Sequence, residues 1–254
     1  MALHTLIDGS STIVEPWPRR VRGLCGNRVV VDSLRTQLHI PERGLPVYYF
    51  PAQDVATELL TPAGHRTDPL GERQLFSLTT QGDTRDEAGW QLTAAQPPVQ
   101  SLQGHYAFRW NAMDAWFEED DEIFVHPKSP YHRIDVLHSS REVRVEVAGV
   151  LLARSQRPRL LFETGLPTRF YLPVSDVRMD LLKASQTSTQ CPYKGIASYW
   201  SFETEPGARR DIAWMYRYPI PECPKIEGLL SFFNERCDIW LDGEKQEKPV
   251  TPWS

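Results

Sequence analysis

The stretch AGWQLTAAQPPVQSLQGHYAFRWNAMDAWFEED, residues 88–120, returns in altered form as IAWMYRYPIPECPKIEGLLSFFNERCDIWLDGE, residues 212–244. A single shift of 124 positions places the second stretch on the first without a gap. Tryptophan is rare, so two matched tryptophans at one shift indicate an internal repeat. The matched positions are Trp90, Pro97, Gly104, Phe108, Asp114 and Trp116 on Trp214, Pro221, Gly228, Phe232, Asp238 and Trp240.

A second block repeats upstream. VVVDSLRTQLHIPERGLPVYYFPAQDV, residues 29–55, resembles LLARSQRPRLLFETGLPTRFYLPVSDV, residues 151–177, at a shift of 122 positions. The chain is therefore a tandem duplication, and each copy is long enough to bury its own core. We divide it into a lead-in (1–20), a first repeat (21–121), a connecting segment (122–141), a second repeat (142–244) and a tail (245–254).

Composition excludes several classes of protein. Hydrophobic residues make up 41% of the 254 residues and charged residues 24%, as in ordinary globular proteins. A net charge of −5 gives no electrostatic footprint for nucleic acid. No apolar run is long enough to span a bilayer, and the first residues do not read as a signal peptide. Four scattered cysteines without a close pair argue against structural zinc and against a disulfide framework. We expect a cytoplasmic protein without metal or organic cofactor.

Both repeats look mainly β. Val143, Val145 and Val147 alternate with polar residues, which is typical of a half-buried strand. Ala148-Gly149 then predicts a hairpin turn, and Thr164-Gly165 another. Residues 224–236 place apolar side chains at helical spacing after Pro224 and predict a short helix, and a second short helix is expected after Asp176.

The segment TSTQCPYKGIASYW, residues 187–200, brings a thiol, two phenols and an ammonium group close together in the sequence. A turn shaped by Pro192 and Gly195 would direct Cys191, Tyr193 and Lys194 to one point, and such a lysine binds an anionic oxygen or holds a thiolate. The first repeat has Asp68 opposite Cys191 and lacks the Tyr-Lys pair. Either the second repeat alone carries a site there, or the first contributes its own polar set of His65, Arg66 and Asp68. The structural alternative is a buried thiol beside a surface lysine.

Two further groups of residues are candidates. Arg169 and Arg178 have no counterpart in the first repeat, and an arginine in a cleft holds a carboxylate, phosphate or phenolate. Glu163 or Asp180 would serve as a general base if burial raised its pKa. The connecting segment adds His126, Tyr131, His132 and Arg133, and a histidine is a natural acid–base group near neutral pH. The structural alternatives are an arginine–carboxylate pair and a histidine bonded to backbone.

We assign catalytic roles to the residues that bear nucleophilic, acidic or basic groups in the second repeat: Lys194, Arg178, Tyr193, Cys191 and Glu163. We assign substrate binding to their neighbours: Arg169, Tyr171, Asp180, Tyr199, Trp200, Trp214 and His132. No P-loop, GxGxxG, GxSxG or HExxH motif is present, which removes most support for NTPase, dehydrogenase and classical hydrolase functions.

The chain contains the strings SDVRMDLL, CPYKG, ASYW and PIP, with HPKSPYHRIDVL between the repeats and TPWS at the end. In these strings it resembles the bacterial and fungal family known as domain of unknown function 427. The likeness covers nearly the whole chain beyond about residue 15 and is specific in the second repeat. It implies a compact, mostly β module similar to Mss4-like or β-tent folds without their zinc cysteines. A nucleotidyltransferase label also attached to the family finds no paired aspartates for two metals here.

We expect a small-molecule enzyme that uses acid–base chemistry without an organic cofactor. Isomerisation, cyclisation or a lyase-type step on an aromatic or polyketide-like metabolite of secondary metabolism needs a base, a donor for the developing oxyanion and a shaped cavity. The alternatives are a non-catalytic ligand-binding or interaction module and a thiol-dependent enzyme that uses Cys191. We expect the protein to bind a small molecule and to bind neither nucleic acid nor a membrane. We also expect it to be a monomer.

Overall fold

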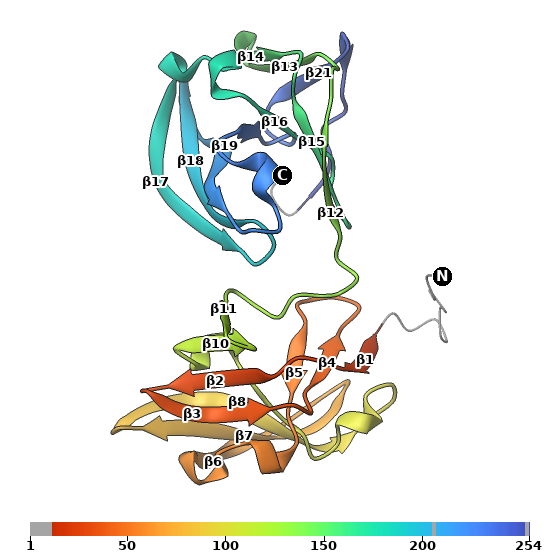
Figure 1. The fold of residues 1–254 in the computed structure, drawn as a ribbon, viewed down its shortest axis with the longest axis vertical. Helices are drawn as coiled ribbons and strands as arrows, with labels where there is room; N and C mark the ends of the chain where they lie inside the picture. The colour runs from red at the N-terminus through yellow and green to blue at the C-terminus, as the bar shows by residue number, and fades with distance from the viewer. Residues whose placement is uncertain (1–11, 205–206, 252–253) are drawn as a thin grey trace. The chain divides into compact units, whose positions relative to one another are not determined.

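A computed structural model describes residues 12–204, 207–251 and 254. The chain forms two compact units, residues 1–129 and 130–254 (Figure 1). The first part of the predicted lead-in, residues 1–11, and two residues of the predicted tail, 252–253, lie outside the described residues. Mainly β structure is confirmed, in several antiparallel sheets.

The described residues of the first unit form three antiparallel sheets, ordered β1-β4-β5, β11-β10-β2-β3 and β6-β7-β8-β9. Its strands are β1 (Ile13–Pro16), β2 (Val21–Cys25), β3 (Arg28–Ser33), β4 (Gln37–Ile40), β5 (Val47–Tyr49), β6 (Leu60–Asp68), β7 (Gly71–Thr80), β8 (Asp83–Ala95), β9 (Tyr106–Phe108), β10 (Ala115–Glu118) and β11 (Asp121–Ile123). Its 3₁₀ turns are η1 (Ala52–Asp54), η2 (Thr57–Leu59), η3 (Gln100–Leu102) and η4 (Trp110–Ala112).

The second unit contains a seven-stranded sheet, β12-β15-β16-β20-β19-β18-β17, and a four-stranded sheet, β14-β13-β21-β22. Its strands are β12 (Ile134–His138), β13 (Val143–Val147), β14 (Val150–Ser155), β15 (Arg159–Glu163), β16 (Arg169–Leu172), β17 (Leu182–Cys191), β18 (Gly195–Thr204), β19 (Gly207–Pro219), β20 (Leu230–Phe232), β21 (Asp238–Leu241) and β22 (Glu244–Lys245). Its 3₁₀ turns are η5 (Val174–Asp176), η6 (Met179–Leu181) and η7 (Pro224–Ile226).

The hairpin predicted at Ala148-Gly149 is confirmed. Both residues have positive φ, 51° and 77°, which fits the right-handed twist of the paired strands β13 and β14. The three valines of β13 are buried and alternate with partly exposed residues, because successive side chains point to opposite faces of a sheet. One side of this small sheet therefore supplies a row of branched apolar groups to the core.

The helix predicted over residues 224–236 is wrong. The structure has the three-residue turn η7, and strand β20 follows. Gly228 between them has φ 64°, which ends helical geometry. Tyr171 on β16 and Trp214 on β19 pair with Ser231, so both neighbouring strands take up the backbone groups of β20. After Asp176 the structure likewise has only the three-residue turn η6, and all helical segments among the described residues are this short.

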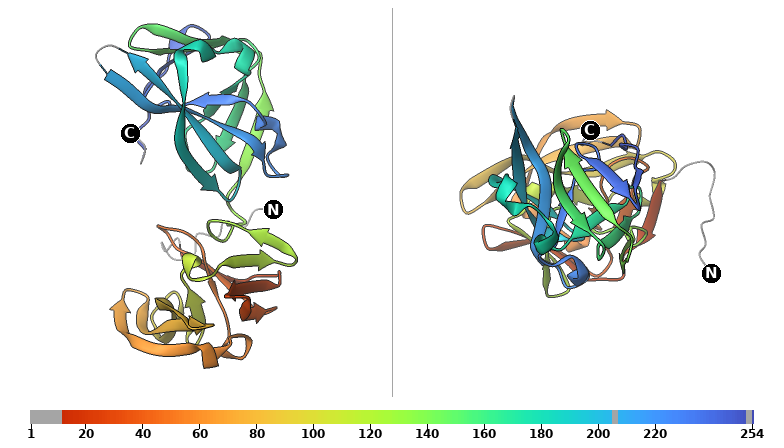
Figure 2. Two further views of the ribbon diagram at one scale, coloured as in Figure 1. Left: turned by 90° about the vertical axis from the view of Figure 1, so that its left-hand side faces the viewer. Right: turned by 90° about the horizontal axis from the view of Figure 1, so that it is seen from above.

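The seven-stranded sheet curls, so that β17 and β18 face β12 and β15 across the second unit (Figures 1 and 2). One face packs on the valines of β13 and on Leu152, Ile239 and Leu241. We call this side the core face. The opposite side, which we call the aromatic face, gathers Tyr171, Tyr199, Trp214, Tyr216 and Phe233.

Strand β16 shows how alternation sorts the two faces. Phe170 and Leu172 belong to the core face, and Tyr171 belongs to the aromatic face. Arg169, two residues before Tyr171, shares its side because the side-chain period of a strand is two. No described helix is long and apolar enough to cross a membrane.

Candidate functional site

Three polar side chains from separate segments of the second unit form one network. Glu163 lies at the end of β15, Lys194 in the turn between β17 and β18, and His132 just before β12. Lys194 Nζ lies 2.5 Å from Glu163 Oε2, and His132 Nε2 lies 3.0 Å from Glu163 Oε1. The carboxylate therefore joins the lysine to the histidine, one oxygen to each.

The turn that carries Lys194 has a local explanation. Cys191 pairs with Gly195 across the hairpin, so Pro192, Tyr193 and Lys194 form the connection. Gly195 has φ 107°, which other residues rarely adopt, and a Cβ there would lie 3.3 Å from the carbonyl oxygen of Tyr218. The Lys194 carbonyl also accepts a bond from the Ile220 amide at 3.1 Å, which holds the turn against the end of β19.

Burial makes this network electrostatically strong. The Glu163 side chain is 5% exposed, that of Lys194 10% and that of His132 22%. Burial opposes the charge on Glu163, but the hydrogen bond from His132 and the charge and hydrogen bond of Lys194 outweigh it, so the pKa of the Glu163 carboxyl is lowered. The condition for Glu163 to act as a general base, a pKa raised by burial, is not met.

The lowered pKa gives Glu163 a different chemical use. A carboxylate only accepts hydrogen bonds, so His132 Nε2 must donate to it, and in the neutral ring the lone pair then sits on Nδ1. The ring of Tyr193 stacks on His132 with centroids 4.2 Å apart and planes 26° apart. His132 is thus fixed in tautomer by Glu163 and in orientation by Tyr193, the arrangement that a catalytic imidazole needs.

The aromatic face adjoins the network and contains further predicted residues. Trp214 Nε1 donates to the buried hydroxyl of Tyr171 at 3.0 Å. The hydroxyls of Tyr199 and Thr189 lie 2.7 Å apart, and the Tyr199 ring stacks with Phe233. Cys191 is partly buried against the same face. The structure therefore groups hydroxyl-bearing aromatic rings in one cluster, and Tyr171 and Tyr216 lie close enough to Glu163 to interact with its charge.

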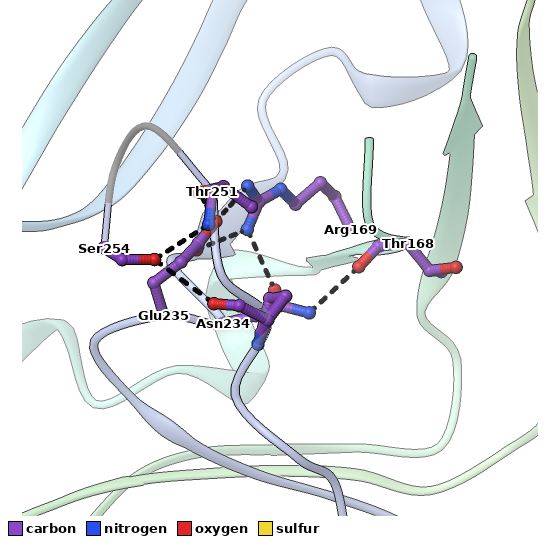
Figure 3. A network of polar contacts seen from close by, with 7 residues as sticks. Thr168, Arg169, Asn234, Glu235, Thr251 and Ser254 are labelled. Carbon is purple, nitrogen blue, oxygen red and sulfur yellow. Dashed lines mark hydrogen bonds and ion pairs between the residues drawn. The ribbon is translucent and has the colours of Figure 1, made fainter. Parts of the chain in front are cut away.

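Arg169 lies on this side of the sheet but is committed to another carboxylate. Its guanidinium holds Glu235 by two bonds of 2.7 and 2.8 Å, with both side chains nearly fully buried (Figure 3). Thr251 donates to the same carboxylate at 2.6 Å, which ties the end of the chain to the ion pair. The guanidinium also lies 5.4 Å from the Trp214 ring centre. This is the structural arginine–carboxylate pair that the sequence left open.

Three other predicted residues lie elsewhere. Arg178 and Asp180 pair with each other through bonds of 2.8 and 2.6 Å, and more than half of each side chain is exposed. Trp200 packs against the core face. The structure does not bring these three residues to the Lys194 network.

Sequence reasoning missed two buried hydroxyl groups. Tyr216 lies on the aromatic face, and its pKa is strongly raised there. Burial is the main cause, and the neighbouring Tyr171 and Cys191 add to it. Ser231 is fully buried, and its Oγ has no hydrogen-bond partner among the described residues. At the shift of 124 positions their counterparts are Leu92 and Ala107, so comparing the copies position by position would have found both.

The polar set predicted in the first unit is divided. His65 and Arg66 are exposed on β6. Asp68 pairs with Gly71 just as Cys191 pairs with Gly195, so the two residues occupy matching positions. The first hairpin is closed by two residues and the second by three, and no residue of the first matches Lys194 in role. Among the described residues, no group of three His, Cys, Asp or Glu side chains is placed to hold a metal ion.

The family model described as NTP_transf_9, domain of unknown function (DUF427), matches the chain twice, over residues 13–119 and 135–243. The chain therefore belongs to this family as a tandem member. No curated protein matches the chain.

Proposed function

We propose that this tandem DUF427 protein is a small-molecule enzyme whose second unit performs acid–base chemistry without an organic cofactor. The observation that carries the proposal is the buried Lys194–Glu163–His132 network at the edge of the aromatic face. Buried ionisable groups linked to a partly exposed histidine are characteristic of catalytic sites. The described residues of the first unit form no such network, which favours a role beyond the needs of the fold.

The residues suggest a division of labour for an isomerisation or cyclisation. His132 Nδ1 takes a proton from an acidic C–H or a phenol O–H of the substrate, and Glu163 positions the ring and stabilises the imidazolium. Lys194 has three N–H donors and gives one to Glu163, so another is free to stabilise a developing enolate or phenolate. For a phenol that adds to an enone, the C–O bond forms at the β carbon and His132 returns the proton to the α carbon.

The aromatic face suggests the class of substrate. Tyr171, Trp214 and Tyr216 are buried in this cluster, whereas Tyr199 is partly buried and is the ring of the aromatic face that a substrate reaches first. Aromatic pairs contribute about 0.5–1.5 kcal/mol each beyond the area they bury, which favours a flat aromatic or polyketide-like molecule. A place in secondary metabolism and in the cytoplasm belongs to the same proposal, as does the assignment of each unit to a Mss4-like or β-tent-type module.

Turnover of a panel of phenols that carry an enone, hydroxychalcones among them, tests the proposal. The wild-type protein is expected to accelerate cyclisation, and Lys194→Ala and His132→Ala to lose about 10²–10⁴-fold of that acceleration. Arg178→Ala is the matched control, because it removes a cation of the same unit that faces solvent. Equal rates for the wild type and Lys194→Ala would remove the site assignment.

A binding module is the second candidate. It is favoured by the pairing of Lys194 with Glu163 and of Arg169 with Glu235, since both cations already have protein partners. Thermal-shift measurements with the same panel separate the two: a compound that stabilises the protein and is recovered unchanged indicates binding. Full activity of Cys191→Ser would exclude a thiol-dependent reaction.

A further inference from the structure

The first unit buries polar groups at positions where the second unit is apolar. His39 on β4 corresponds to Leu161, and Arg73 on β7 corresponds to Ala197. The strand registers support these matches, because His39 pairs with Val47 as Leu161 pairs with Arg169, and Arg73 pairs with Leu92 as Ala197 pairs with Tyr216. After the duplication, equivalent positions of the two units therefore came to carry polar side chains in the first unit and apolar ones in the second.

His39 and Arg73 lie among aromatic rings. His39 is 3% exposed and meets the ring of Tyr49 edge-on at 6.0 Å. The Arg73 guanidinium lies 5.0 Å from the ring centre of Trp90, and Trp90 Nε1 donates to the Tyr49 hydroxyl at 3.3 Å. Arg73 also pairs with Asp68 at 2.8 Å, and their side chains are 15% and 25% exposed. Both side chains of the pair are thus more exposed than His39.

Two nitrogen atoms in this group lack a protein partner. His39 Nε2 and Arg73 Nε are both buried, and neither forms a hydrogen bond within the described part of the chain. Buried polar atoms in native proteins are nearly always paired with protein, ligand or water. A molecule with a hydroxyl group that hydrogen-bonds to these nitrogens would supply the missing partners.

The charges restrict what that group is. Burial and the charge of Arg73 lower the pKa of His39 to about 4, so the ring is neutral at neutral pH. Arg73 Nε–H donates, while a neutral imidazole presents one donor and one acceptor nitrogen. A hydroxyl accepts from Arg73 and donates to His39 without adding charge, whereas a carboxylate would place a second anion beside Asp68.

We propose that the first unit is a second ligand site, in which His39 Nε2 and Arg73 Nε bind the hydroxyl group of a phenol. Tyr49 and Trp90 supply the ring contacts. The site is separate from the proposed catalytic network, and it goes beyond the proposed function by giving the diverged copy a binding role of its own.

The test follows the His39 imidazole by NMR while phenol is added to the full chain. We expect a saturable shift of the His39 ring signals with phenol, and a much weaker one with toluene, which has no hydroxyl, or with benzoate. The double variant His39→Leu with Arg73→Ala takes the residues that the second unit has at these positions. Phenol affinity measured by calorimetry should fall about tenfold or more in this variant.

Several outcomes would overturn the proposal. A His39 signal that phenol leaves unmoved indicates that water alone pairs with these atoms, and a stronger response to benzoate indicates an anion site. Because the titration uses the wild-type chain, the answer does not depend on folding of the variant. Lys194→Ala should leave the phenol response of His39 unchanged, so failure of this site and failure of the proposed catalytic site are distinguishable.

Discussion

Arg169→Ala tests whether this arginine is a structural element or a ligand anchor. The substitution leaves the Glu235 carboxylate, whose side chain is fully buried, without its two bonds of 2.7 and 2.8 Å. Thr251 remains as one donor. Removing one partner of a buried ion pair costs about 3–5 kcal/mol, and two charge-assisted hydrogen bonds at about 1.5–3 kcal/mol each give a similar figure. We therefore expect the free energy of unfolding of the second unit to fall by about 4 kcal/mol.

Urea unfolding followed by tryptophan fluorescence measures this change, because Trp214 lies beside the guanidinium. Arg157→Ala is the matched control: it removes a mostly exposed arginine, and Asp176 keeps its hydrogen bonds from Ser155 and Ser175, so the midpoint should move less. A double variant with Arg169→Met and Glu235→Leu should recover most of the loss, since an apolar pair leaves no buried charge. If Arg169→Ala is as mild as the control, the ion pair is not structural and Arg169 is available to a ligand.

Two further predictions concern His39 and Gly195. The pKa of His39 is lowered to about 4 from 6.5, so between these values the unfolded chain binds more protons than the folded one. The contribution of His39 to the free energy of unfolding is full above about pH 6.5 and falls by about 3 kcal/mol as the pH drops through 4. In urea unfolding across this range, the stability of His39→Leu should therefore depend less on pH than that of the wild type. Parallel stability curves for the two proteins would contradict the lowered pKa of His39. Gly195→Ala forces a side chain onto φ 107°, so it should cost about 1–3 kcal/mol in thermal unfolding and displace Lys194. Gly149→Ala, with nothing near its Cβ position, is the control for backbone strain alone. If both variants lose the same share of cyclisation activity, Gly195 has no special role in placing Lys194.

Local signals in the sequence predicted local structure well. Ala148-Gly149 identifies a hairpin because few residue pairs tolerate two positive φ angles. The apolar spacing of Ile226, Leu229, Leu230 and Phe233 misled the helix prediction. A 3₁₀ turn followed by a strand can bury the same residues, and pairing of β20 on both sides outweighed local propensity.

The candidate site was predictable by residue type and not by geometry. Glu163 and Lys194 are 31 residues apart and meet because the curled sheet brings the end of β15 to the β17–β18 turn. No local sequence pattern predicts the contact between Glu163 and Lys194. Arg178 differs between the copies just as Lys194 does, yet it pairs with Asp180 two residues away, so divergence alone does not identify a site.

Proton transfer by the Lys194–Glu163–His132 network is the central step of the proposed function, and uptake of deuterium from solvent measures it most directly. A hydroxychalcone is incubated in D₂O with the wild-type protein, and deuterium at the α carbon of the cyclised product is followed by mass spectrometry. We expect enzyme-dependent deuterium incorporation that Arg178→Ala retains and that both Lys194→Ala and His132→Ala lose. Incorporation at the uncatalysed rate with the wild-type protein, or undiminished incorporation in both network variants, would contradict it.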